Sequence, residues 1–238
     1  MLTKFSKIIY FDTLESSSDY LINLYKKNPI KNELVVVANN QTKGRGRMGK
    51  SWFSDKGSLT FSCSISMSKF LHSWQINMAA SLALIKLLDN HGIHAFIKYP
   101  NDIIINNKKI AGILNEVINI DSTRYCILGV GLNINNELFP QNISRSISMK
   151  NLLLKKTSKT KILKTLLSYL NLFLQEVLLN RAYVSNLYGF KNHVLCVYKG
   201  VKNYVKILSV TKQGFLTIET IEKEVLTVNS VDVKFLLS

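Results

Sequence analysis

Hydrophobic residues recur along this chain with two different periods. Apolar positions at helical spacing predict helices over three segments: 19–27, 74–90 and 161–180, the last continuing to about residue 190. Short apolar runs, or apolar residues alternating with polar ones, predict strands over seven others: 8–11, 34–38, 59–67, 93–98, 103–105, 110–118 and 125–134. Strands and helices are therefore interspersed through most of the chain.

Local signals add detail to several of these elements. Ser17 or Ser18 is a suitable N-cap for the first helix. The segment 59–67 alternates large apolar with small polar residues, a pattern typical of a strand that buries one face only. An Asn-rich turn at 106–109 predicts a hairpin, and two glycines interrupt the strand 125–134.

The pattern changes from His193 onward, where the strands become short and closely spaced. They recur about every ten residues with turn signals between them, at 194–198, 202–210, 215–220 and 225–228. This spacing predicts a small antiparallel barrel. We therefore divide the chain into a first domain, 1–190, and a C-terminal domain, 191–238.

Composition places the chain among globular proteins. It has 238 residues, 47% of them hydrophobic, which is enough for a core in one large domain with a small second one. No apolar run reaches the ~18 residues of a transmembrane helix, and the N-terminus lacks a signal-peptide core. Three widely spaced cysteines, each within an apolar segment, indicate buried thiols in a reducing cytoplasm.

The net charge is strongly positive, at +16. Such a balance favours a polyanionic partner, which could be a nucleic acid, a nucleotide or an acidic protein. The lysines are spread along the chain, however, so most of them are expected on a solvated surface. Aromatic residues are not interleaved with them in the way that favours single-stranded nucleic acid.

The segment 41–52 concentrates unusual residues, with three glycines, two arginines, two lysines and a tryptophan. Glycines let the backbone approach a ligand closely, and arginines present donor pairs that suit phosphate or carboxylate. The glycine spacing fits a dinucleotide fingerprint, but no helical pattern follows it, so that assignment is rejected. The residues indicate a loop that closes over an anionic small molecule, with a basic surface turn as the alternative.

Polar or glycine-rich clusters at the ends of other elements are weaker candidates. Residues 15–18 supply hydroxyls where a helix begins, although a plain N-cap would explain them equally well. Clusters at 98–102, 109–112 and 129–133 combine charged or amide side chains with small residues, and each alone could be a bulge or a packing feature. The four histidines form no metal-binding motif, and no nucleophile elbow or Walker motif is present.

Taken in order, these clusters resemble biotin–protein ligases, the biotin–[acetyl-CoA-carboxylase] ligases. The resemblance extends from about residue 8 to the C-terminus and rests on five motifs: ESSSDYL (15–21), QTKGRGRMGKSW (41–52), KYPND (98–102), KIAGILNE (109–116) and GVGLNIN (129–135). It implies an α+β fold. This fold has a mixed β-sheet with flanking helices, similar to class II aminoacyl-tRNA synthetases, followed by a small SH3-like β-barrel.

The resemblance implies an ATP-dependent ligase. Biotin would react with ATP and Mg2+ to give biotinyl-5′-AMP and pyrophosphate, and the biotin would then pass to a lysine of a biotin carboxyl carrier domain, from acetyl-CoA carboxylase or a related carboxylase. Fixed cations lower the barrier to such an in-line attack electrostatically, and no covalent enzyme nucleophile is needed. A closing loop would keep the mixed anhydride from water.

The resemblance also assigns roles to individual residues. Lys109, Arg45 and Arg47 are the expected catalytic cations. Trp52 and Asn133 are expected at the nucleotide, and Asp102 at the ribose or magnesium. The expected biotin site comprises Ser16, Ser17, Ser18, Gln41, Arg45, Gly46, Arg47, Lys109, Gly112, Gly129 and Gly131, and no protein-bound metal cluster is expected.

The chain also departs from the family pattern. Ser18 replaces the usual Asn, Tyr99 replaces a common Trp, and Met48 and Lys50 stand where basic residues, often Arg, are common. Only about 14 residues precede the serines, which predicts the short monofunctional form without a DNA-binding domain and without specific DNA binding.

The pattern leaves other properties and readings open. The protein could be a monomer or a homodimer. A lipoate–protein ligase is an alternative enzyme, although the Gly-Arg-Gly-Arg-x-Gly sequence argues against it. A nucleic-acid-binding module, suggested by the charge and the terminal barrel, is an alternative of a different class.

Overall fold

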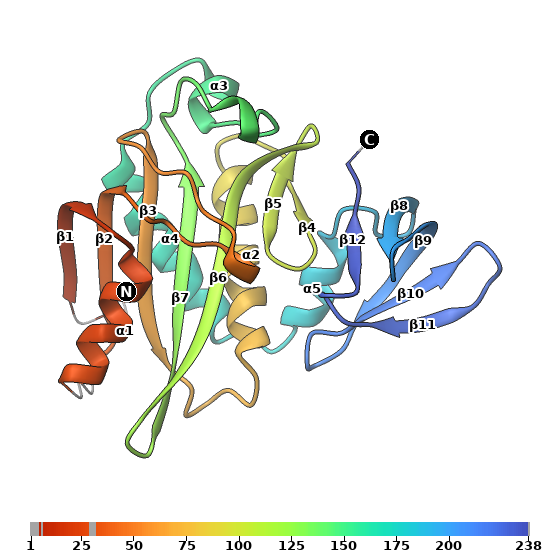
Figure 1. Ribbon diagram of the computed structural model, residues 1–238, viewed down its shortest axis with the longest axis horizontal. Coiled ribbons are helices and arrows are strands. Elements are labelled where there is room, and N and C mark those ends of the chain that lie inside the picture. Colours follow the sequence, from red (N-terminus) through yellow and green to blue (C-terminus); the bar gives the residue numbers. More distant parts are fainter. Residues whose placement is uncertain (1–4, 6, 29–31, 238) are drawn as a thin grey trace.

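The computed structural model describes residues 5, 7–28 and 32–237 (Figure 1). Its largest element is a seven-stranded sheet in the order β1-β2-β3-β7-β6-β5-β4. Only β1 and β2 pair in parallel, so the sheet is mixed. The strands are β1 Lys7–Leu14, β2 Leu34–Gln41, β3 Ser58–Ser66, β4 Phe96–Lys98, β5 Asp102–Ile105, β6 Lys108–Ile120 and β7 Thr123–Asn133.

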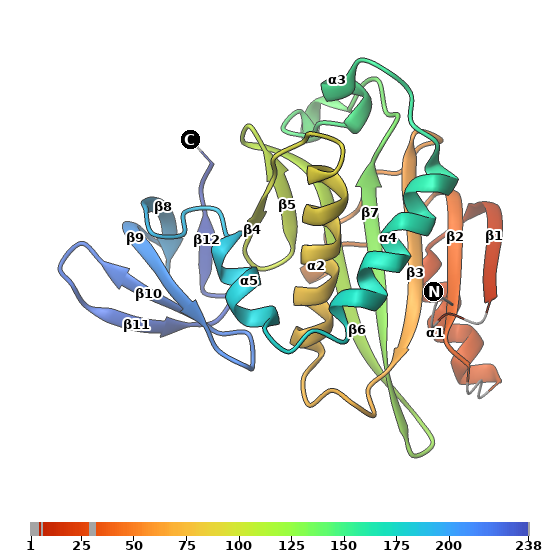
Figure 2. The same cartoon turned by 180° about the vertical axis from the view of Figure 1, so that it is seen from behind.

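Helices cover both faces of this sheet, which confirms the expected α+β architecture of a mixed sheet with flanking helices. Figure 2 shows α2 and α4 across one face, and Figure 1 shows α1 on the other. Two short helices, α3 and α5, lie at the sheet margins. The helices are α1 Ser17–Lys27, α2 Ser73–Asp89, α3 Met149–Leu153, α4 Lys159–Phe173 and α5 Leu179–Ser185.

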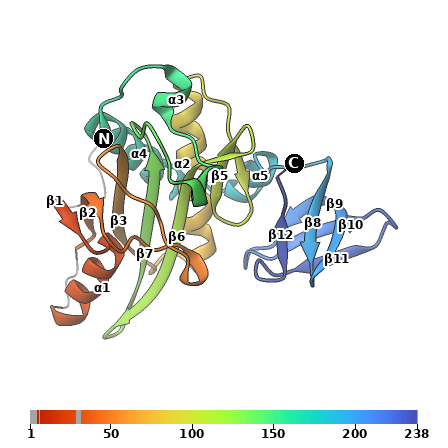
Figure 3. The same cartoon turned by 45° about the horizontal axis from the view of Figure 1, so that its top comes forward.

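A second, five-stranded antiparallel sheet follows, in the order β11-β10-β9-β8-β12. It stands beside the β4–β5 end of the first sheet (Figure 3), where the Tyr99 hydroxyl donates to the carbonyl of Gly214 at 2.7 Å. Its strands are β8 His193–Tyr198, β9 Val201–Val210, β10 Leu216–Thr220, β11 Val225–Val228 and β12 Val233–Phe235. The last of these is absent from the sequence prediction, because three residues are too few to show a period.

Strand β3 differs from its prediction as a half-buried strand, because both of its faces are buried. The serine face lies under α1 instead of facing water. The Ser64 hydroxyl is 2.6 Å from the hydroxyl of Tyr25, and Ser62 contacts two serines of the same helix. Small hydroxyl residues fit here because they bury little volume and their hydrogen bonds are satisfied.

Three further element predictions are corrected. The predicted helix 161–180 ends at Phe173, and α5 is a separate helix that turns toward β9, where Asn180 donates to the carbonyl of Val210 at 2.7 Å. Strand β7 is continuous through Gly129 and Gly131, since both stay paired with β3 and β6. Of the predicted strand 93–98, only the last three residues form a strand, β4. Among the described residues, no helix is long and apolar enough to cross a membrane.

Candidate functional site

A cavity of about 340 Å³ lies on the sheet between the start of α1, the 41–52 loop and the C-terminal sheet. Strands β3, β6 and β7 form its floor. Its lining includes Ser16, Ser17, Ser18, Gln41, Arg45, Gly46, Arg47, Trp52, Asp102, Lys109, Gly112, Gly129 and Gly131. Thirteen of the fourteen residues that the sequence singles out therefore meet in one place.

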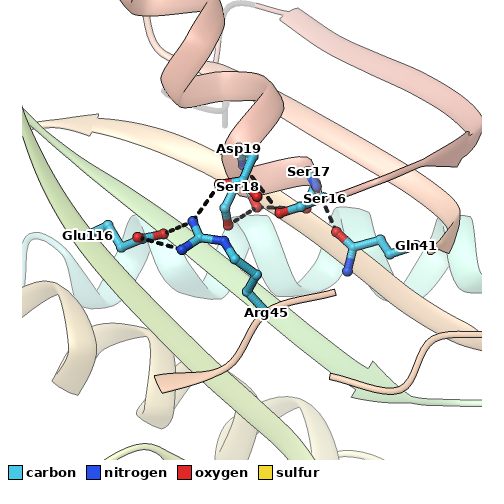
Figure 4. A network of polar contacts seen from close by, with 8 residues as sticks. Ser16, Ser17, Ser18, Asp19, Gln41, Arg45 and Glu116 are labelled. Carbon is cyan, nitrogen blue, oxygen red and sulfur yellow. Dashed lines mark hydrogen bonds and ion pairs between the residues drawn. The ribbon is translucent and has the colours of Figure 1, made fainter. Parts of the chain in front are cut away.

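The serine turn forms one end of this cavity. Figure 4 shows the polar contacts of its side chains. The N-cap is Ser16 and not the predicted Ser17 or Ser18, and its hydroxyl accepts from the N–H of Asp19 at 3.2 Å. The shift places both following serines in the first helical turn, where their hydroxyls reach Ser62 Oγ at 2.7 and 2.9 Å. The serine hydroxyls carry no charge, and the charge of nearby Arg45 is balanced by Asp19 and Glu116, so this end of the cavity is polar without net positive charge.

Gln41 and Gly129 complete this polar end. The Gln41 Oε1 atom accepts from the N–H of Ser17 at 2.7 Å, which fixes its side-chain amide against the turn. A Cβ atom on Gly129 would lie 2.8 Å from Ser18 Oγ, so only glycine lets the strand approach the serines this closely.

The 41–52 loop folds back on itself over the sheet. Its Gly46 N–H donates to the carbonyl of Lys50 at 2.6 Å, and Trp52 N–H donates to the carbonyl of Gly44 at 2.8 Å. Met48 occupies the left-handed region with φ 54° and is 73% exposed. A Cβ atom on Gly44 would lie 2.5 Å from the Trp52 carbonyl, which accounts for the glycine there.

The indole of Trp52 lies against the strand glycines. A Cβ atom on Gly131 would lie 2.2 Å from the ring, and one on Gly112 would lie 3.1 Å from it. The ammonium of Lys109 stands 5.3 Å from the centre of the ring, within cation–π range. The buried indole Nε1 has no hydrogen-bond partner within the described part of the chain. The glycines therefore make room for an aromatic wall in mid-cavity.

The guanidinium of Arg45 is held by two carboxylates. It contacts Glu116 through both terminal nitrogens, at 3.0 and 2.6 Å, and Asp19 at 2.8 Å (Figure 4). Burial by itself lowers the pKa of Arg45, but the hydrogen bond and charges of these acids outweigh it and raise the pKa. The contact joins the loop to β6 and α1. Both acids lie within the sequence motifs, but the sequence alone gives neither of them a role.

The other two candidate cations differ in their partners. Lys109 Nζ pairs with Asp102 at 2.7 Å, while the Lys109 backbone is paired with the 145–147 segment. Arg47 Nη2 donates to the hydroxyl of Ser230 at 2.9 Å, and no carboxylate of the described residues pairs with it. Arg47 is therefore the less neutralised of the two.

Asn133 is the one predicted residue that does not line the cavity. It is buried, and its side-chain amide donates to the carbonyls of Ile147 at 3.1 Å and Lys109 at 3.4 Å. The role at adenine stays a prediction.

Several lining residues escape the sequence analysis. Lys98 and Tyr99 stand in a recognised motif but receive no role there, and Ser62 shows no signal beyond its place in a strand. The C-terminal segment contributes Ser230, Val231, Val233, Lys234 and Phe235. No periodicity could place these five residues beside a loop nearly 190 positions earlier, because that contact is purely tertiary.

The two ends of the cavity differ in charge. Hydroxyls and an amide line one end, while Arg47, Lys50, Lys98, Lys109 and Lys234 bring positive charge to the other. Such a site suits an elongated ligand with a neutral polar head and an anionic tail. No group of three His, Cys, Asp or Glu side chains that could hold a metal occurs in the described residues.

Residues 10–133 match the biotin/lipoate A/B protein ligase family. The chain is 37% identical over 137 residues to the bifunctional ligase/repressor BirA of Bacillus subtilis, an alignment that covers 55% of this chain and 41% of BirA. It is 32% identical over 108 residues to the biotin–[acetyl-CoA-carboxylase] ligase of Mycobacterium tuberculosis, covering 42% of this chain and 39% of that ligase. The chain thus matches less than half the length of these relatives.

Solved structures resemble the chain over almost its whole length. The biotin protein ligase from Aquifex aeolicus in complex with biotin and ATP superposes with a TM-score of 0.83 at 24% identity, covering 98% of this chain and 100% of that one. The biotin acetyl coenzyme A carboxylase synthetase from Helicobacter pylori, with bound biotinylated ATP, gives 0.66 at 24% identity, covering 93% and 99%. At these identities the likeness concerns the fold.

Proposed function

The chain belongs to the biotin/lipoate A/B protein ligase family, and we propose that it is a biotin–protein ligase. It would join biotin to ATP as biotinyl-5′-AMP, releasing pyrophosphate, and then transfer the biotin to a lysine of a biotin carboxyl carrier domain. The observation that carries the proposal is the division of one cavity into a neutral hydroxyl-lined end and a cationic end.

The neutral end suits the ureido ring of biotin, whose carbonyl accepts and whose N–H groups donate hydrogen bonds. The hydroxyls of Ser16, Ser17 and Ser18, with Gln41, offer both donors and acceptors to it. Lipoate carries no ureido group, so a cluster of buried hydroxyls favours biotin between the two acids. Gly129 and Gly131, Gly112 and Gly46 would let the ligand and Trp52 lie close to the backbone.

The cationic end suits the carboxylate and the α-phosphate, which repel each other until positive charge lies between them. Lys109 and Arg47 would supply that charge and stabilise the charge that builds at the phosphorus during in-line attack. Arg45 would anchor the loop, which would exclude water from the mixed anhydride.

The transfer step requires the carrier lysine in its neutral form. Its amine attacks the acyl carbon, the anhydride bond breaks, and AMP leaves with the electron pair. Asp102 lines the cavity beside Lys109 and is the candidate for accepting the proton. Mg2+ commonly binds through one or two carboxylates and substrate phosphates, so a single Asp102 also fits as its protein ligand.

The remaining assignments follow from the same proposal. An acidic carrier domain of acetyl-CoA carboxylase or a related carboxylase would complement the net charge of +16. We place the catalytic part in residues 1–190 and an SH3-like barrel in 191–238. The protein would act in the cytoplasm, as a monomer or a homodimer.

The direct test incubates the chain with ATP, Mg2+, a carrier domain and either biotin or lipoate, with avidin blotting and ATP–pyrophosphate exchange as readouts. Biotin should support both exchange and labelling. Lys109→Ala and Arg47→Ala should abolish most of the labelling, while Lys202→Ala, an exposed lysine of β9 outside the cavity, should not change it. Exchange that depends on lipoate and not on biotin would overturn the proposal.

A further inference from the structure

Tyr99 lines the cavity, but the proposed function gives it no role. Its side chain is almost fully buried, with only 4% of the residue exposed. The phenol hydroxyl reaches out of the first sheet and donates to the carbonyl of Gly214 at 2.7 Å, in the turn between β9 and β10. A buried hydroxyl therefore stands at the junction of the two sheets, on the wall of the candidate site.

The ring of Tyr99 is held in place by aromatic and backbone contacts of the first sheet and its helices. Its centroid lies 5.8 Å from the ring of Trp74, which in turn lies 5.4 Å from the ring of Tyr183. The next residue, Pro100, is anchored through its carbonyl, which accepts from Asn77 at 2.9 Å and from the Tyr183 hydroxyl at 3.0 Å. These contacts fix the position of the Tyr99 hydroxyl.

Ser230 connects this hydroxyl to the cation Arg47. Its Oγ atom accepts from Nη2 of Arg47 at 2.9 Å, and a longer contact, 3.4 Å to Oδ1 of Asn229, holds it in its turn. Burial raises the pKa of Tyr99 to about 12, and the charge of Arg47 and a side-chain hydrogen bond with Ser230 oppose that rise. Contacts therefore run from the guanidinium through both hydroxyls to the backbone of the C-terminal sheet.

A hydroxyl holds a guanidinium without neutralising it. Arg45 shows the alternative, because two carboxylates balance its charge. No carboxylate of the described residues pairs with Arg47, so its charge stays available to an anionic ligand. Uncharged oxygen atoms that orient a cation suit a group that must stabilise negative charge as it develops.

We propose that Tyr99 is a positioning residue for Arg47: through Ser230 it orients the guanidinium toward the α-phosphate of ATP. The inference rests on the proposed function and gives the C-terminal sheet a part in it. Only the guanidinium touches the nucleotide, and the two hydroxyls act through it. Removing either hydroxyl would leave the cation present but wrongly oriented.

The kinetic test measures biotin-dependent ATP–pyrophosphate exchange. Ser230→Ala should lower kcat about tenfold, Tyr99→Phe should lower it about fivefold because it acts through Ser230, and the KM for biotin should stay within about twofold. Ser230→Thr keeps a hydroxyl and should retain most of the activity. Neither loss of a hydroxyl should lower kcat further in an Arg47→Ala background, because both effects pass through that guanidinium.

Two matched variants control for the loss of a hydroxyl. Tyr25→Phe removes another buried phenol hydroxyl, which donates to the carbonyl of Asn32 at 2.5 Å and does not line the cavity. Ser209→Ala removes an exposed hydroxyl of β9. Neither should change kcat, and thermal melting of every variant checks folding. Equal losses of kcat in the presence and absence of Arg47 would overturn the inference, because Tyr99 would then act only by holding the two sheets together.

A second readout separates this inference from the proposed function. Hydrogen exchange of the unliganded protein, followed by mass spectrometry, needs no substrate. Peptides that cover residues 44–52 should exchange faster in Tyr99→Phe and Ser230→Ala than in the unsubstituted chain and the two controls. Faster exchange in a chain that makes no biotinyl-AMP would keep the positioning of Arg47 and remove the proposed function. Unchanged exchange would overturn the inference, even in a chain that labels a carrier domain.

Discussion

Arg45 offers the sharpest test of how the site is built, because its charge is already engaged. We expect Glu116→Gln to loosen the 41–52 loop and so weaken biotin binding. The substitution keeps the shape of the side chain but removes its charge, so two contacts between opposite charges at 3.0 and 2.6 Å become at most one hydrogen bond from the guanidinium to an uncharged carbonyl. Asp19, at 2.8 Å, remains to hold the guanidinium.

The size of the effect follows from exposure. A charge-assisted hydrogen bond is worth about 1.5–3 kcal/mol when shielded, and an exposed ion pair about 0.2–1 kcal/mol. The side chains of Arg45 and Glu116 are 36% and 28% exposed, between these limits. We therefore expect a loss of about 1–2 kcal/mol, a rise of about 5–30-fold in the KM for biotin.

The assay is carrier labelling at saturating ATP, with kcat and the KM for biotin measured separately. Arg45→Ala and the double variant complete a double-mutant cycle, and their effects should be strongly non-additive. Glu15→Gln is the matched control. It removes a contact of similar length, 2.7 Å to Lys43, between side chains that are 70% and 68% exposed, and should leave the KM unchanged.

A different outcome would refute the reasoning. If Arg45 acts directly on the reacting groups, Arg45→Ala will lower kcat at constant KM, and Glu116→Gln will have no effect on the KM or will raise kcat by freeing the cation. Additive effects of the two substitutions would lead to the same conclusion.

Three further outcomes are expected. Ser62→Ala should raise the KM for biotin about fivefold, because it removes the hydroxyl that joins two serines. Ser64→Ala, two residues along the strand, should lower stability without changing that KM. Equal effects of the two substitutions on the KM would contradict this. Gly131→Ala should displace Trp52 from the floor, because the new methyl would lie 2.2 Å from the ring, at a cost of about 1–3 kcal/mol, and an unchanged tryptophan emission spectrum would argue against it. Burial raises the pKa of Tyr25 from 10.0 to about 12, so the folded chain keeps a proton that the unfolded chain loses, and stability should fall as pH rises through this window. The free energy of unfolding, measured in urea at pH 9 and pH 11, should therefore fall less between these pH values in Tyr25→Phe than in the unsubstituted chain. An equal fall in both proteins would refute the assignment.

Much of the fold could be predicted from periodicity, and the exceptions have physical causes. Helix α2 and strand β2 are long, strongly patterned elements, and both lie within a few residues of their predicted bounds. The alternation in β3 correctly indicates a strand but not its second buried face. That face depends on α1 packing over small hydroxyls, which a pattern within one segment does not encode. After α4 the backbone turns through local hydrogen bonds, from the N–H groups of Gln175 and Glu176 to the carbonyls of Leu172 and Phe173, and the apolar pattern does not reveal this break.

The site shows the same division. The motifs contain most of the residues that line the cavity, because each places polar or charged groups at the end of an element, but they miss Ser62 and the five C-terminal residues. The pattern does not reveal which charges meet. Arg45 and Lys109 are predicted as comparable cations, yet the first is held by two acids and the second by one, and Arg47 pairs with a hydroxyl. Which charges pair depends on their distance in space, and positions along the sequence do not give this distance.

The bond from Arg47 to Ser230 joins residues 183 positions apart. Ribosomes synthesise the chain from its N-terminus, so the serine turn, the loop and β7 all exist long before this contact can form. Five of the residues between 230 and 235 line the cavity, and it can be completed only when they have emerged. A nascent chain would therefore hold a floor and a lid without the wall that closes them. The order of synthesis thus postpones completion of this cavity until residue 235 has been added.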